Sequence, residues 1–334
     1  MRVLTSTEQK TLEHFFALPQ DKLKAVMSHY LRKQYPKVIE TKDYLFCEGT
    51  IPVCMVAHLD TVFSEQPSEI YYDRRKNVMF SPQGLGADDR AGVFSILKLV
   101  QDGLRPHIIL TTGEEKGGIG ARALAKLTCP FRDVRYFIEL DRRGALDCVF
   151  YECDNPEFTR YVESFGFFEN WGTYSDICEF CDTWGIAGVN LSIGYENEHT
   201  HHETLNISYM FSTLDKVKKM LACAFDAEQY KFIRGDYTKF WATCAYGYGW
   251  GFDSDVKKCG SCGKYHMEEE LFPVVTLKGT TAFYCPDCLT EKVAWCKRCG
   301  SAYEKVMPEE PDEGTCPHCA KEKKNDNNRR KDKK

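Results

Sequence analysis

The fold class is decided by IPVCMVAHLD at residues 51–60, together with GADDRAGVFSILKLVQ at residues 86–101. The first stretch is a short and nearly continuous apolar run, which is typical of a strand buried on both faces of a sheet. In the second stretch, apolar residues recur at helical spacing after a pair of acidic residues. A buried strand followed by a helix is the repeating unit of a parallel sheet, so the two stretches predict an α/β fold.

The alternation of strands and helices continues to about residue 195. Three more apolar runs predict buried strands: RPHIILTTGEE (105–115), VRYFIELD (134–141) and IAGVNLSIG (186–194). The segment ARALAKL (121–127) predicts a helix between the first two of them. We therefore expect a three-layer α/β sandwich with a mostly parallel mixed sheet.

Helical patterns lie on either side of this region. Ser6 and Gln9 form a weak capping box within a helical stretch at residues 6–34. An amphipathic segment at about 207–233 would close the first domain. The chain then divides by composition into a first domain at 1–233, a linker rich in Tyr, Trp and Gly at 234–258, a cysteine-rich module at 259–320 and a disordered basic tail at 321–334.

The composition is that of a globular protein without a membrane segment. The chain has 334 residues, of which 43% are apolar, enough to fill a sizeable core. Its longest apolar runs, such as VFSILKLV at 93–100, are far shorter than the roughly 20 residues that a spanning helix needs. The N-terminus, MRVLTSTEQK, has no apolar signal-peptide core. We therefore expect a cytoplasmic protein whose 17 cysteines are mostly reduced.

Acids and histidines follow every predicted strand of the first domain. Because the carboxyl ends of parallel strands meet at one edge of a sheet, we expect these side chains to share a crevice. Carboxylates packed so closely repel one another unless cations neutralise them, which predicts a metal site. The side chains are His58, Asp60, Asp88, Asp89, Glu114, Glu115, Asp141 and His199.

The order of these motifs resembles that of the co-catalytic dizinc exopeptidase superfamily. The superfamily includes bacterial leucyl aminopeptidases, carboxypeptidase G-like enzymes, peptidase T and glutamyl aminopeptidases. The resemblance covers about residues 50–205 and implies a zinc-dependent exopeptidase. It is carried by HLDTV (58–62), GADDRAG (86–92), GEEKGGIGA (113–121), ELD (139–141) and the H-T-x-x-E of residues 199–203.

The resemblance implies five ligands for a pair of zinc ions: His58 and Asp141 for one ion, Glu115 and His199 for the other, and Asp88 as the bridge. The last ligand has two rivals, because His201 and His202 stand beside His199. We favour His199, since it alone stands four residues before Glu203. Zinc accepts such imidazole and carboxylate ligands, and cobalt and manganese are the alternative metals.

Two further residues would act in the chemistry. The resemblance makes Glu114, which adjoins a ligand, the general base, and Asp60 would hydrogen-bond the His58 imidazole and orient it. The two ions would share a bridging water and polarise the scissile carbonyl. The predicted function is hydrolysis of an amide bond in a small peptide, with aminopeptidase activity favoured. The alternatives are a deacylase or carboxypeptidase acting on acyl-amino acids, and a non-catalytic adaptor that keeps the hydrolase fold.

The spacing of the motifs indicates a compact, lid-less branch of the superfamily. Only 57 residues separate Asp141 from His199, too few for the lid and dimerisation domain of the larger carboxypeptidase-like enzymes. The segment TYSDICEF (173–180) resembles a further element near the site. Because Ile177 stands where many relatives have His, we expect no catalytic role for that element. Substrate specificity would lie in loops without motifs, at about 62–85 and 142–190.

Eight cysteines form four CxxC pairs in residues 259–320. Their spacing, CxxC-x22-CxxC and then CxxC-x16-CxxC, is typical of zinc ribbons in which four cysteines hold one ion. We expect two structural zinc ions with sequential pairing, and an interleaved pairing is the alternative. The ligands would be Cys259, Cys262, Cys285 and Cys288 in the first ribbon, and Cys296, Cys299, Cys316 and Cys319 in the second.

Charge argues against nucleic acid as the partner of the ribbons. Residues 259–320 hold six Lys and Arg against ten Asp and Glu, whereas phosphate binding needs clustered positive charge. We expect the ribbons to bind a protein partner or to mediate self-association. The first domain would bind a small peptide or an acyl-amino acid.

Overall fold

A computed structural model describes residues 2–235 without a break. It also describes residues 256–262, 265–267, 271–278, 280–286, 288–289, 293–299, 301–305, 314–317 and 319–320. The chain divides into two compact units, Met1–Asp236 and Tyr237–Lys334. Most of the predicted linker, 234–258, and all of the predicted basic tail, 321–334, lie outside the described residues. Within the described parts of the chain, no helix is both long and apolar enough to cross a membrane.

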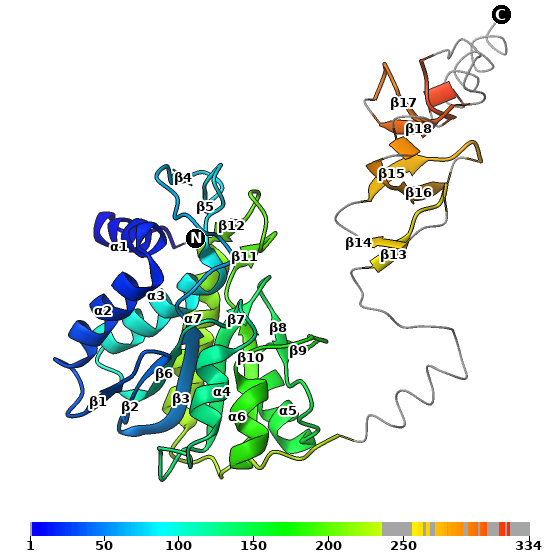
Figure 1. Ribbon diagram of the computed structural model, residues 1–334. Helices are drawn as coiled ribbons and strands as arrows, with labels where there is room; N and C mark the ends of the chain where they lie inside the picture. The colour runs from blue at the N-terminus through cyan, green and yellow to red at the C-terminus, as the bar shows by residue number, and fades with distance from the viewer. Residues whose placement is uncertain are drawn as a thin grey trace, which may run out of the picture. The chain divides into compact units, whose positions relative to one another are not determined.

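A mixed sheet of eight strands forms the centre of the first unit (Figure 1). Its order is β1-β2-β6-β3-β7-β10-β8-β9. The central four strands run parallel, namely β6 (Pro106–Thr111), β3 (Ile51–His58), β7 (Tyr136–Arg142) and β10 (Gly188–Ser192). The outer strands are β1 (Val38–Glu40), β2 (Tyr44–Cys47), β8 (Asp147–Val149) and β9 (Phe168–Glu169), and β2 and β8 run antiparallel to their central neighbours. The predicted fold class is confirmed.

Helices cover both faces of this sheet, so that the unit has three layers (Figure 1). Along β3, Val53, Met55 and Ala57 join one core cluster, while Cys54 and Val56 join the other. Such alternation requires apolar residues at every position of a central strand, which explains the continuous run in the sequence. The first face packs against α1 (Ser6–Ala17), α2 (Gln20–Leu31), α3 (Ala87–Gln101), α5 (Pro156–Glu163) and α7 (Ile207–Cys223), and the second against α4 (Ile119–Ala125) and α6 (Ile177–Trp184).

Two predicted helix boundaries are wrong. The capping box of α1 consists of Thr5 and Glu8, because Thr5 is extended and each of these residues bonds the backbone N–H of the other. Helix α7 ends at Cys223, whereas the prediction extended it to residue 233. The chain beyond it runs beside the start of β10 instead, where Ala187 N–H donates to Tyr230 O at 2.9 Å.

A second sheet, which the sequence did not predict, lies beside the carboxyl end of the main one (Figure 1). Its order is β11-β12-β5-β4, and each of its strands has only two or three residues. Strands this short cannot show a period of two, so part of the region predicted as loop is sheet. The strands are β4 (Tyr71–Asp73), β5 (Val78–Phe80), β11 (Tyr195–Glu196) and β12 (Thr204–Asn206).

The second unit contains a sheet shared by both cysteine-rich segments. Strands β15 (Phe272–Val275) and β16 (Thr281–Tyr284) come from the first segment, and β17 (Val293–Trp295) and β18 (Ala302–Glu304) from the second. A parallel pairing of Val275 with Tyr303 joins the two halves. A separate hairpin pairs β13 (Val256–Lys258) with β14 (Tyr265–Met267).

Candidate metal centre

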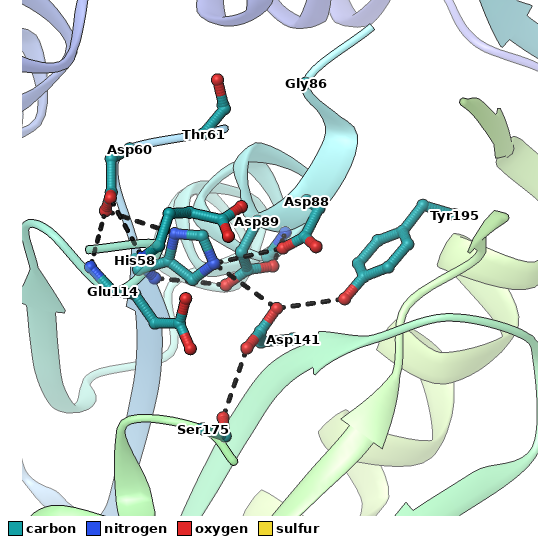
Figure 2. Close-up of polar contacts among 12 residues, drawn as sticks. His58, Asp60, Thr61, Gly86, Asp88, Asp89, Glu114, Asp141, Ser175 and Tyr195 are labelled. Carbon is teal, nitrogen blue, oxygen red and sulfur yellow. Dashed lines mark hydrogen bonds and ion pairs between the residues drawn. The ribbon is translucent and has the colours of Figure 1, made fainter. Parts of the chain in front are cut away.

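The residues predicted from the motifs converge at the carboxyl ends of the central strands (Figure 2). His58 ends β3, Asp141 lies near the end of β7, and Glu114 and Glu115 lie in the turn that follows β6. Asp88 lies in the first turn of α3. His199 comes from the loop between β11 and β12, so the second sheet supplies one member of the cluster.

Asp88 lies between the two histidines. Its Oδ1 atom is 3.1 Å from His58 Nε2, and its Oδ2 atom is 3.1 Å from His199 Nε2. Asp141 Oδ1 lies 3.5 Å from His58 Nε2, and Glu115 Oε2 lies 3.2 Å from His199 Nε2. The side chains therefore form two triads that share Asp88.

These distances suit a pair of zinc ions. Two ligand atoms that each lie about 2.0–2.1 Å from one tetrahedral ion are about 3.3–3.4 Å apart. The imidazole–carboxylate separations in both triads, 3.1–3.5 Å, are close to that value. Glu115 Oε1 is also buried and has no hydrogen-bond partner among the described residues, so it is free to act as a ligand. The donor set therefore fits two divalent cations.

The pKa values in the cluster report a strongly negative potential. Hydrogen bonds with the Asp88 and Glu115 carboxylates raise the pKa of His199 to about 11. Burial would lower the pKa of His58, but Asp141, Asp60 and Asp88 outweigh it and hold that pKa well above its usual range. Burial, together with neighbouring carboxylates, raises the pKa of Glu114 to about 7. Such a cluster calls for added positive charge.

Asp60 contacts both the imidazole and the loop that carries the acids. Its Oδ1 atom lies 3.5 Å from His58 Nδ1. It also accepts hydrogen bonds from the backbone N–H groups of Gly113, Glu114 and Glu115, at 2.8, 3.1 and 3.3 Å. The motif predicted a hydrogen bond at the first contact, whereas the structure shows a close approach only, with no hydrogen-bond partner for His58 Nδ1 among the described residues. The second contact was not predicted, because it depends on how β3 and β6 lie side by side.

Three further contacts at the site were not predicted, although Ser175 and Glu203 lie in the TYSDICEF and H-T-x-x-E motifs. Ser175, from the TYSDICEF segment, donates to Asp141 Oδ2 at 3.2 Å, and Tyr195 donates to Asp141 Oδ1 at 3.0 Å (Figure 2). Glu203 accepts the backbone N–H of Asp88 at 3.0 Å. Tyr195 and Glu203 come from the β11–β12 hairpin, which links the second sheet to both triads.

The three neighbouring histidines differ in their contacts. His199 has a positive φ of 64°, and its Nε2 atom faces Asp88 and Glu115. The His201 ring instead lies against Phe63, with ring centroids 5.9 Å apart. Neither His201 nor His202 belongs to a potential metal cluster among the described residues. The Asp88–Asp89 peptide is cis.

The cysteines of the second unit form two groups of four in the order of the sequence. The groups are Cys259, Cys262, Cys285 and Cys288, and Cys296, Cys299, Cys316 and Cys319. Cys262 Sγ lies 3.9 Å from Cys285 Sγ, and Cys299 Sγ lies 3.6 Å from Cys316 Sγ. Tetrahedral ligands at a Zn–S distance of about 2.3 Å lie about 3.8 Å apart. The grouping is sequential, as favoured from the spacing.

Comparison with known proteins supports the reading of the first unit. Residues 48–165 match the model of peptidase family M28. Among solved structures, the aminopeptidase PepT from Bacillus cereus is 15% identical with a TM-score of 0.51, and it covers 64% of this chain and 97% of its own. A tripeptidase from Staphylococcus aureus is 14% identical with a TM-score of 0.52, covering 65% and 97%. No curated protein sequence matches the chain significantly.

The M28 match and the aminopeptidase-like fold indicate a zinc metallo-exopeptidase, a hydrolase. Peptidases of family M28 are zinc-dependent. The match to peptidase family M28 over residues 48–165 and the shared fold support the resemblance to the co-catalytic zinc exopeptidase superfamily that the motifs carry.

Proposed function

We propose that this protein is an aminopeptidase that hydrolyses small peptides with two zinc ions. The observation that carries the proposal is the position of Asp88, whose two oxygens face His58 and His199 separately. A carboxylate placed in this way can bridge two ions about 3.5–4 Å apart. Asp141 would complete one site and Glu115 the other. The names of the two similar structures, an aminopeptidase and a tripeptidase, favour a short peptide with a free N-terminus.

The chain supplies the proton transfer. Bound zinc would lower the pKa of a water molecule and polarise the scissile carbonyl. Glu114 has a carboxylate oxygen within 4.8 Å of ligand atoms of both His58 and Glu115, so it can reach a water between them. The Glu114 carboxylate would accept a proton from that water while the oxygen of the water bonds to the carbonyl carbon. Glu114 would then return the proton to the leaving nitrogen as the C–N bond breaks.

Replacement of Glu114 tests this assignment. We expect Glu114→Gln to keep the zinc content of the wild type and to lose about 10²–10⁴-fold in kcat, because the base is removed and the ligands are not. The assay is hydrolysis of a panel of dipeptides, tripeptides, N-acetylated peptides and acyl-amino acids, with zinc measured by plasma mass spectrometry. Glu163→Gln, an exposed glutamate on α5, is the matched control.

The panel also separates the candidate activities. An aminopeptidase cleaves the free peptides and spares their N-acetylated forms, whereas a deacylase shows the reverse preference. If the wild type cleaves none of these compounds with zinc, cobalt or manganese supplied, the proposal is wrong.

A further inference from the structure

Asn190 contacts the main chain of Asp141 on both sides of that residue's Cα atom. The Asp141 N–H donates to Asn190 Oδ1 at 2.9 Å, and Asn190 Nδ2 donates to the Asp141 carbonyl oxygen at 2.6 Å. Asn190 is 1% exposed and lies on β10, the strand next to β7. One buried amide therefore holds both peptide units that flank Asp141.

These contacts occur where the ladder between β7 and β10 is interrupted. Asn190 pairs with Glu139, but the next pair is Ser192 with Arg142, so β7 has one residue more than β10 between the two pairs. Such a bulge leaves main-chain groups without ladder partners and redirects a side chain. The Asn190 amide provides a donor and an acceptor where the ladder lacks them.

The carboxylate of Asp141 is held as well. Ser175 Oγ, which also donates to Glu139 Oε2, lies 3.2 Å from its Oδ2 atom, and Tyr195 donates to its Oδ1 atom, the oxygen that lies 3.5 Å from His58 Nε2 (Figure 2). Asn190 Nδ2 also lies 2.9 Å from the Tyr151 hydroxyl oxygen and 3.1 Å from Ser175 Oγ, so the same amide contacts one of these hydroxyls. The orientation of Asp141 thus depends on Asn190 through the backbone and through Ser175.

We propose that Asn190 is a positioning residue that presents Asp141 to the metal shared with His58. The inference rests on the proposed function, because it takes Asp141 as a ligand. An aspartate at position 190 would still accept the Asp141 N–H. It would, however, place a carboxylate oxygen against the Asp141 carbonyl oxygen, two acceptors without a hydrogen between them.

The test compares Asn190→Asp with Asn155→Asp in the full chain. Asn155 is also a buried asparagine that caps α5, and its Nδ2 donates to the Lys231 carbonyl oxygen at 2.9 Å, so its replacement by aspartate opposes two acceptors in the same way but away from the metal site. Loss of an outer-shell partner typically weakens metal binding by about 10–100-fold. We expect that loss for one of the two ions bound by His and carboxylate in Asn190→Asp, and wild-type affinity in Asn155→Asp. Titration with Co²⁺ measures this affinity. The weak visible bands of cobalt at the His and carboxylate sites can be told apart from the intense near-ultraviolet bands of cobalt at the cysteine sites.

A second readout separates positioning from general destabilisation. Addition of zinc should raise the melting temperature of Asn190→Asp less than that of the wild type, whereas a merely structural role would lower both values and leave the zinc-induced rise unchanged. Wild-type cobalt affinity in Asn190→Asp would overturn the inference while leaving the proposed function intact. A wild type that binds no metal at the His and carboxylate sites would overturn both.

Ser175→Ala provides a second test if Asn190→Asp does not fold. This variant removes the hydroxyl between Asn190 and Asp141 Oδ2 without adding a charge. We expect it to weaken the same ion to a smaller extent. Unchanged cobalt binding in Ser175→Ala would overturn the part of the inference that runs through this hydroxyl.

Discussion

At the scale of single residues, the sequence predicts which side chains gather at the site, but not the neighbouring residues that hold them in place. The motifs place His58 and Asp141 at strand ends and Asp88 at the start of a helix, and such residues meet at the carboxyl edge of a parallel sheet whatever the details of packing. The contacts of Asn190 and Tyr195 depend on a bulge and on a hairpin from another sheet. No local pattern reports such tertiary contacts, so the sequence could not reveal them.

Glu8 is a charged residue of α1, outside the site, whose carboxylate contacts the start of its own helix and Lys98 of α3. Its carboxylate accepts the Thr5 N–H at 3.0 Å and lies 3.1 Å from Lys98 Nζ. Burial alone would raise the pKa of Glu8, but these hydrogen bonds and the Lys98 charge outweigh it and lower the pKa from 4.5 to about 2. The folded state therefore favours the ionised form more than the unfolded state does.

We expect Glu8→Gln to destabilise the protein by about 1–2 kcal/mol at neutral pH, because glutamine still accepts the Thr5 N–H but cannot pair with the charges of Arg2 and Lys98. Because the folded pKa is the lower one, the contribution of the charge is complete above about pH 4.5 and disappears as the pH falls toward about 2. The deficit of the variant should therefore shrink in acid. Calorimetry over this pH range measures it, with Glu13→Gln on the same helix as the control. A deficit that does not change with pH would contradict this explanation.

At the scale of elements, long segments were predictable and short ones were not. The central strands and α3 follow from apolar runs and helical periodicity. Strands β11 and β12, with two and three residues, carry no such pattern, yet their hairpin brings His199 to the site. Helix α7 was predicted ten residues too long, because the apolar residues after Cys223 pack as an extended segment beside Ile186.

The two cysteine groups lie on opposite faces of their shared sheet. Val274 and Ala302 pack in the cluster of the first group, whereas their neighbours Val275 and Tyr303 pack with the second. Successive residues of a strand point to opposite faces. Strand β18, which comes from the second segment, thus helps to form the core around the first group.

We expect Cys316→Ser to reduce the zinc bound by both cysteine groups, because loss of the second ion would loosen β18 beneath the first. Zinc per chain after dialysis, measured by plasma mass spectrometry, should fall by nearly two ions. The control is Cys223→Ser, an exposed cysteine at the end of α7 that belongs to neither group. A loss of one ion only would show that the two groups bind metal independently.

At the scale of the whole molecule, the chain joins a catalytic unit to a unit with cysteine sites. The boundary between the units falls at Asp236 and Tyr237, within the segment that composition marked as a linker. We propose four zinc ions per chain, two in each unit, and a role for the ribbons in contact with a protein partner or a second copy. The composition of the ribbons, acidic and without clustered positive charge, favours such a contact over nucleic acid.

The pair of ions around Asp88 is the central claim, and anomalous diffraction at the zinc edge from crystals of the full chain tests it most directly. We predict two peaks on either side of the Asp88 carboxylate, about 3.5–4 Å apart, one next to His58 and Asp141 and the other next to Glu115 and His199. A single peak, or two peaks that do not share Asp88, would contradict it.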